Sequence, residues 1–176
     1  MSKDLDFSPA RTVTGDALLG ENTRLGRLAW LMKYVRADDL YFVQDGALSE
    51  MLFREAADSF VNGQFLATIV LAFSFIERSI AGRLSYVGEN KTAEGKSKDL
   101  LAAALDRGWL TPDEIKSLDE IRLLRNPIVH YRDSFDAKRP EIRAALEGKP
   151  HSILFEADAR KVLEAAIHII LAKTAL

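Results

Sequence analysis

The segment from Phe65 to Ile76 constrains the fold more than any other part of this 176-residue chain. It is nearly apolar throughout, and it lies in the first half of a helix that we predict from about Gln64 to Tyr86. A helix that is apolar on almost every side belongs in the middle of a bundle, because each face then needs a neighbour. The stretch is 12 residues long and ends at Glu77, so it is too short to span a bilayer and indicates a buried core helix.

Amphipathic helices that would surround this central helix are indicated by the 3.6-residue spacing of apolar side chains elsewhere. The clearest helix start is at Thr111, because a threonine N-cap, Pro112 at the first helical position and Glu114 at the third form a capping box. The expected β structure is at most one small hairpin, built from the N-terminal segment 41–43 and from 152–155. The predicted fold class is therefore all-α, a bundle of four to five helices. The main helices expected in this bundle span about 47–61, 64–86, 97–107, 112–125 and 156–176, with a short helix near 141–146 and one more helix at 23–35 in the N-terminal segment.

The chain is predicted to have two parts. Residues 1–46 form an N-terminal extension, in which a loose polar segment precedes one helix, and residues 47–176 form the helical domain. The net charge is −2 and the sequence pI is about 6.0, so no global basic field would attract nucleic acid. Any contact with RNA or DNA therefore requires a local basic patch.

Composition excludes several kinds of site. The absence of cysteine excludes disulfides, thiolate metal sites and cysteine nucleophiles. His130, His151 and His168 show no close pairing in the sequence, so we expect no metal site and no cofactor; His168 lies in an apolar helix and is expected to be packed. Neither a phosphate-binding G-x-x-x-x-G-K loop nor a G-x-S-x-G nucleophile motif is present. The first residues resemble no secretory signal, and we expect a cytoplasmic protein without a membrane partner.

The segment most informative about function is Arg125-Asn126-Pro127-Ile128-Val129-His130. A guanidinium grips a phosphate with two prongs and stays charged at any working pH. An imidazole accepts or donates a proton near neutral pH. Together these two side chains could bind and cut a phosphodiester without a metal. The structural alternative is a proline kink beside a surface arginine and a packed histidine.

Pro127 decides whether Arg125 and His130 converge. On a straight helix, side chains five residues apart point about 140° from each other. Proline lacks the backbone N–H and disfavours helical geometry at the residue before it, so we expect one helix to end near Arg125. A second helix would then begin with Asn126 as N-cap and Pro127 as first residue. Its free backbone N–H groups would add an anion-binding element beside Arg125.

The hexapeptide resembles the signature of the HEPN superfamily, which is an arginine, usually a polar residue, three mostly apolar residues and a histidine. Tyr131 matches the common aromatic follower, and the preceding helix ends in hydrophobic residues at 121–124. A long apolar helix that carries a glutamate, here Phe73 to Glu77, precedes the motif as in many members. The resemblance covers about residues 47–176 and implies a HEPN-like helical bundle.

This resemblance also implies a function and a partner. HEPN domains usually dimerise, so that two arginine–histidine motifs line one cleft at the interface. Many are metal-independent endoribonucleases, a class of hydrolase, in toxin–antitoxin, phage-defence or RNA-processing systems, and others are inactive modules for dimerisation or for binding a nucleotide or RNA. Because Arg125 and His130 are both present, we expect an active endoribonuclease that acts as a homodimer on RNA, with an antitoxin or another regulatory protein as a further partner. The inactive module is the alternative.

The residues of the motif receive distinct roles in this hypothesis. His130 is the expected acid or base at the RNA 2′-hydroxyl or the leaving oxygen, and Arg125 holds the scissile phosphate and offsets charge in the transition state. Asn126 is grouped with them as a catalytic candidate, and three roles stay open for it: bonding to phosphate, orienting His130, or capping the helix.

Four neighbouring residues complete the candidate site. Tyr131 either stacks on a base or packs inside the protein. Arg122 and Arg132 either line the cleft or are solvated surface residues. Glu77 lies on the apolar stripe of the central helix, where a carboxylate needs a partner. Arg125 is our candidate partner, which Glu77 would orient, and another lysine or arginine is the alternative.

Overall fold

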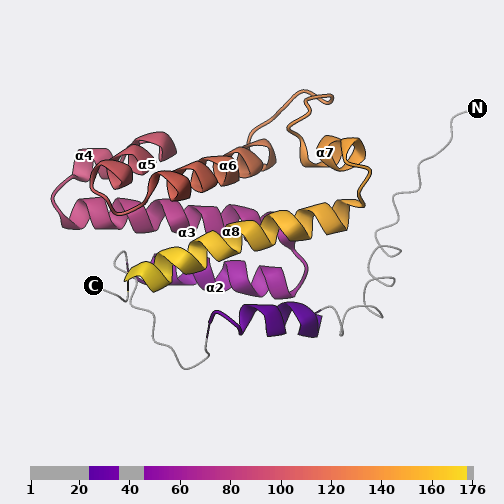
Figure 1. The fold of residues 1–176 in the computed structure, drawn as a ribbon, viewed down its shortest axis with the longest axis horizontal. Helices are drawn as coiled ribbons and strands as arrows, with labels where there is room; N and C mark the ends of the chain where they lie inside the picture. Colours follow the sequence, from indigo (N-terminus) through magenta and orange to yellow (C-terminus); the bar gives the residue numbers. More distant parts are fainter. Residues whose placement is uncertain (1–23, 36–45, 174–176) are drawn as a thin grey trace, which may run out of the picture.

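The computed structural model describes residues 24–35 and 46–173, and all regular secondary structure in these ranges is helical (Figure 1). The all-α prediction is therefore confirmed. Residues 24–31 form a first helical segment. The labelled helices that follow are α2 (Ala47–Val61), α3 (Phe65–Tyr86), α4 (Asn90–Ala93), α5 (Ser97–Asp106), α6 (Pro112–Val129), α7 (Pro140–Leu146) and α8 (His151–Lys173).

The prediction of a hairpin strand at 152–155 is wrong. These residues form the beginning of α8, which starts five residues earlier than the pattern indicated. The backbone N–H groups of Ile153 and Leu154 both donate to the Pro150 carbonyl, which closes the first helical turn. Leu154 is buried whereas Ile153 is exposed, so the short apolar run contributes one side chain to the core. The other proposed hairpin segment, 41–43, lies outside the described residues.

The central position predicted for the apolar helix is confirmed. α3 packs against α2, α4, α5, α6 and α8, and its buried side chains include Ile69, Phe73, Phe75 and Ile76 (Figure 1). Within the described part of the chain, α3 is the one helix whose length and composition would suit a membrane span. Its packing against helices on several sides accounts for that composition in this structure.

The first helical segment is attached to the bundle through a buried arginine. Arg27 Nε donates to the Val61 carbonyl at 3.1 Å, and Arg27 Nη1 lies 3.8 Å from a carboxylate oxygen of Glu156 in α8. Nearby, the Trp30 ring packs against Phe60, with 5.0 Å between centroids, and Leu31 joins the core. Residues 24–35 therefore share the hydrophobic core of the helices that follow.

α6 begins with the predicted capping box. The Glu114 backbone N–H donates to Thr111 Oγ1 at 3.3 Å, and the Thr111 backbone N–H donates to Glu114 Oε2 at 2.7 Å. These bonds satisfy donors that the first turn of a helix leaves without partners. They also lower the pKa of the Glu114 carboxyl, first through the Thr111 backbone N–H and then through its hydroxyl.

The predicted helix break at Pro127 is wrong. α6 continues through Pro127 to Val129, and His130 is its C-cap, with its backbone N–H bonded to the Asn126 carbonyl at 2.9 Å. Pro127 lies in the last turn, so its missing N–H costs a single hydrogen bond near the helix end. Because no second helix begins there, Asn126 is not an N-cap and no free N–H groups lie beside Arg125.

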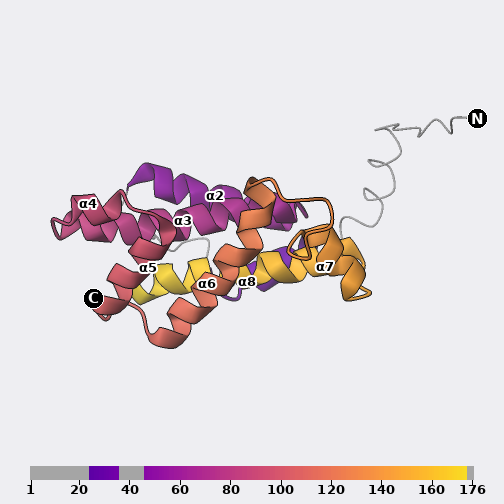
Figure 2. The ribbon, with the colours of Figure 1, turned by 90° about the horizontal axis from the view of Figure 1, so that it is seen from above.

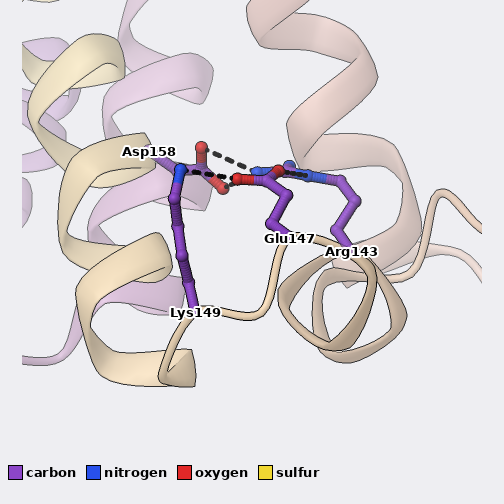
Figure 3. A network of polar contacts seen from close by, with 4 residues as sticks. All are labelled: Arg143, Glu147, Lys149 and Asp158. Atoms are coloured by element: carbon purple, nitrogen blue, oxygen red, sulfur yellow. Dashed lines mark hydrogen bonds and ion pairs between the residues drawn. The ribbon is translucent and has the colours of Figure 1, made fainter.

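α7 is held against α8 by a polar network (Figure 3). Arg143 Nη2 donates to both carboxylate oxygens of Asp158, at 3.1 and 2.9 Å. Arg143 Nε also lies 3.8 Å from Glu147 Oε1, and Lys149 Nζ donates to Glu147 Oε2 at 2.8 Å. Burial raises the pKa of the Asp158 carboxyl, and the Arg143 charge opposes this effect. The network fixes the short helix that follows the loop after His130.

We expect the Thr111→Ala variant to be less stable than wild type by about 1 kcal/mol, since it removes the cap of α6. Urea unfolding measures this difference, and Thr111→Ser, which keeps the hydroxyl, should stay close to wild type. The pKa of Glu114 is lowered in the folded state, so its ionised carboxylate stabilises the fold. This stabilisation is fully present above the ordinary carboxyl pKa and is lost as the pH falls through the lowered pKa of the folded state. An alanine variant as stable as wild type at neutral pH would contradict the role of this cap.

A second prediction concerns Asp158. Folding raises the pKa of the Asp158 carboxyl, so the folded protein holds this proton more tightly than the unfolded chain does. The folded state therefore loses stability at this group as the pH rises from the ordinary carboxyl pKa of 3.8. The free energy of unfolding of Asp158→Asn, relative to wild type, should therefore increase over this rise in pH. Urea titrations at several pH values measure it. A decrease would mean that the attraction of Arg143 outweighs the cost of burial.

Candidate functional site

Arg125 projects from α6 toward the central helix α3. Its Nη2 atom lies 3.9 Å from Glu77 Oε2, and its guanidinium carbon lies 5.7 Å from the centre of the Phe73 ring. The other carboxylate oxygen of Glu77 accepts a hydrogen bond from the Ser97 hydroxyl at the start of α5. The predicted pairing of Glu77 with Arg125 is confirmed, and it connects α3, α5 and α6 at one point.

The Arg125 side chain is held but not enclosed. About 20% of it is exposed, and its Nε atom is buried without a hydrogen-bond partner. A buried donor without a partner costs free energy, which a ligand that accepted a hydrogen bond from it would recover. Ser97 was missed by sequence reasoning, because nothing in the sequence indicates that the start of α5 lies against the middle of α3.

His130 occupies a different position from Arg125. It is exposed, it caps the carbonyl end of α6, and its neighbours are the residues of the loop toward α7. α6 ends at Val129, and His130 follows it in an extended conformation, with φ −119° and ψ 136°. Arg125 faces Glu77 and Phe73 of α3, whereas His130 lines a pocket whose walls do not include Arg125. The geometry within one chain therefore does not bring the guanidinium and the imidazole of the motif together.

Asn126 and Arg122 are engaged with each other along α6, and the Arg122 side chain is mostly buried. Arg122 Nε and Nη2 each lie 2.8 Å from Asp119 Oδ1. With its amide oriented so that both atoms are satisfied, Asn126 donates to the Arg122 carbonyl at 3.3 Å and accepts from Arg122 Nη1 at 3.2 Å. The charge of Arg122 is thus balanced within its own helix, and the Asn126 amide is oriented by Arg122.

A shallow pocket of about 250 Å³ lies between the end of α6 and the start of α7. Its walls come from residues 127–132 and from Arg139 and Glu141. Arg132 lines this pocket, and its Nε atom is buried without a hydrogen-bond partner. Tyr131 is 89% exposed, so the alternative that it packs inside the protein is wrong.

Arg139 and Glu141 were missed as site residues by sequence reasoning. Arg139 Nε donates to Glu141 Oε1 at 2.6 Å. The backbone N–H of Glu141 itself, followed by the Arg139 guanidinium, lowers the pKa of the Glu141 carboxyl, which is therefore ionised at neutral pH. The sequence feature that could have indicated this site is Pro140, because a proline between Arg139 and Glu141 predicts that a helix starts there. The closeness of that start to His130 follows only from the packing of α7.

The remaining histidines lie apart from the motif. His168, expected to be packed, is exposed at a second hollow of about 250 Å³, which Glu114 and Leu118 also line. His151 is exposed, and its ring stacks on Phe155 with 5.9 Å between centroids. In the described ranges, no three histidine, aspartate or glutamate side chains are arranged to hold a metal ion.

Comparisons with protein-family models, with curated proteins and with solved structures found no match to this chain. The likeness to the HEPN superfamily therefore rests on the hexapeptide Arg125–His130 and on its helical surroundings. The structure shows two features of this hexapeptide. The arginine of the motif is held by a glutamate of the central helix, and the histidine is exposed at the end of the helix that carries both residues.

Proposed function

We propose that the protein is a metal-independent endoribonuclease that uses Arg125 and His130. The observation that carries the proposal is the state of Arg125, whose guanidinium is held by Glu77 and Phe73 and stays partly exposed with one unpaired donor. A guanidinium held in this way is suited to bind a phosphate with little loss of side-chain freedom. The exposed imidazole of His130 supplies a group that can transfer protons near neutral pH.

The chemistry needs no metal. The imidazole of His130 takes the proton of an RNA 2′-hydroxyl, and the 2′-oxygen then attacks the adjacent phosphorus. The bond from phosphorus to the 5′-oxygen breaks, and a second, protonated imidazole gives its proton to that leaving oxygen. The products are a 2′,3′-cyclic phosphate and a 5′-hydroxyl. Arg125 stabilises the charge that builds on the phosphate oxygens in the transition state.

A homodimer would supply what one chain lacks. Within one chain Arg125 is held against α3 whereas His130 lines the pocket beyond the end of α6, and each chain carries a single histidine in the motif. Two copies that meet along the exposed ends of α6 could place the arginine of one chain opposite the histidine of the other. Leu123 and Val129 are exposed apolar residues on this part of α6, where they could contribute to such an interface.

An RNA-binding or nucleotide-binding module without cleavage is the second candidate. The different surroundings of Arg125 and His130 within one chain favour it, because a cleaving site requires both groups at the same phosphate. As an active enzyme, the protein would act in the cytoplasm in a toxin–antitoxin or phage-defence role, and an antitoxin would then restrain it. These cellular assignments follow from the family resemblance alone.

We expect purified wild type to cleave RNA in excess EDTA, and His130→Ala to reduce the rate by about 10²- to 10⁴-fold, the usual contribution of a general acid or base. Arg125→Ala should reduce it comparably, because the transition-state charge loses its partner. His168→Ala is the matched control, since it removes an exposed histidine outside the motif. Gel analysis of product ends measures both rate and chemistry. Equal cleavage by wild type and His130→Ala, or loss of cleavage with EDTA, would contradict the proposal.

We also expect Glu77→Gln to lower kcat by about tenfold, because a guanidinium displaced by even 1 Å can cost up to about 10²-fold in rate. If Glu77 acts only by positioning Arg125, the pH dependence of cleavage keeps its wild-type shape. Steady-state kinetics over a pH series separate the two effects. Loss of one limb of the pH profile would instead make Glu77 a proton-transfer group.

A further inference from the structure

The loop from Tyr131 to Arg139 carries cationic side chains that the proposed cleavage step does not use. Figure 1 shows this loop extending beyond the ends of α6 and α7. It carries Arg132 at its start and Arg139 at its end, and both line the pocket between the two helices. These two cations therefore come from opposite ends of the loop to the walls of one pocket.

Glu141 is the carboxylate among the residues that line this pocket. It pairs with Arg139, so the charge of that guanidinium is met internally in the free protein. Asp133 and Asp136 in the same loop bond to backbone N–H groups, of Phe135 at 3.1 Å and Lys138 at 2.8 Å. The pocket thus has two cations against one carboxylate, and it keeps a net positive charge.

One hydrogen-bond donor of the pocket also lacks a partner. The Nε atom of Arg132 is buried without a hydrogen-bond partner, whereas Arg139 has Glu141 as its partner. An anion in the pocket would meet the positive charge of Arg132 and could compete with Glu141 for Arg139. A phosphate, with several acceptor oxygens, can bond to both guanidinium groups at once.

The aromatic residues of the loop indicate the source of that phosphate. Tyr131 is 89% exposed and Phe135 is 87% exposed, so two rings project from the same loop as the cations. Exposed rings beside cations are typical of proteins that bind single-stranded nucleic acid, because unpaired bases stack on the rings while the backbone follows the charges. A free phosphate ion would make no use of these rings.

We propose that this pocket binds a second backbone phosphate of single-stranded RNA, next to the phosphate that is cleaved. Arg132 and Arg139 hold this second phosphate, Glu141 is the internal anion that it displaces from Arg139, and Tyr131 stacks on a neighbouring base. The inference rests on the proposed RNA substrate. It assigns to Arg139 and Glu141 a role in substrate binding that the hexapeptide does not indicate.

The test is the affinity of the full chain for a short, unstructured 2′-O-methyl RNA with a fluorescent label, which binds but cannot be cleaved. Fluorescence anisotropy over a salt series compares wild type with Arg132→Gln, Arg139→Gln, their combination, and Glu141→Gln. Lys161 of α8 donates to Glu120 of α6 at 2.7 Å, and neither residue lines the pocket. Glu120→Gln is therefore the control for Glu141→Gln, and Lys161→Gln is the control for each single arginine substitution, because each control changes the net charge by the same amount as its counterpart.

The double arginine variant should bind about tenfold more weakly, and the slope of log Kd against log salt should fall by about 0.7, which corresponds to one lost phosphate contact on a single strand. Glu141→Gln should bind more tightly, by about three- to tenfold, because the internal competitor is gone. A gain in affinity cannot result from misfolding. Both control variants should bind as wild type does, since salt screens distant charges.

Unchanged affinity in the double arginine variant, or weaker binding by Glu141→Gln, overturns the proposal. Cleavage of ordinary RNA by wild type in EDTA is measured separately, so the two proposals fail in different ways. A protein that cuts RNA but ignores the pocket substitutions keeps its proposed function and loses this second phosphate site. A protein that shows the binding pattern without cutting keeps the site and loses the nuclease activity.

Discussion

The burial of α3 is the constraint on which the rest of this structure depends. Its phenylalanine and isoleucine side chains at positions 73, 75 and 76 are essentially inaccessible to solvent, and each contributes about 1.5–3 kcal/mol when it leaves water. Such a helix needs neighbours on several sides, and α2, α5, α6 and α8 provide them (Figure 2). Glu77 is carried into this packed environment by the same helix, where an ionised carboxylate requires partners. Ser97 and Arg125 meet that requirement from two further helices.

The arginine and the histidine of the motif are therefore placed by different forces. Arg125 is drawn inward, toward the carboxylate and the Phe73 ring of α3. His130 lies where α6 ends, and its surroundings are set by the loop and by α7 rather than by the core. The pairing of Arg143 with Asp158 keeps α7 beside α8, and this keeps Arg139 and Glu141 at the pocket (Figure 3). A network remote from the motif thus shapes the surface beside it.

Sequence patterns predicted those features that depend on neighbours along the chain. The capping box at Thr111, the extent of the central helix and the all-α class follow from local propensity and from the spacing of apolar residues. The pairing of Glu77 with Arg125 was also predictable, because a carboxylate on an apolar stripe must find a cation and the motif offered one. Patterns failed at 152–155, where a short apolar run fits a strand and a helix start equally well.

What the sequence alone determined is the set of chemical groups and the helices that carry them, because helix formation and capping depend on residues within a few positions of each other. Tertiary structure decided how these groups are oriented. Packing of α6 on α3 and α8 accompanies its continuation through Pro127, where local rules predicted a break, and this continuation removes the helix start that was expected beside Arg125. The docking of α7 brought Arg139 and Glu141 to the pocket beside His130. Both results depend on contacts between residues distant in sequence, whose energies no local pattern contains.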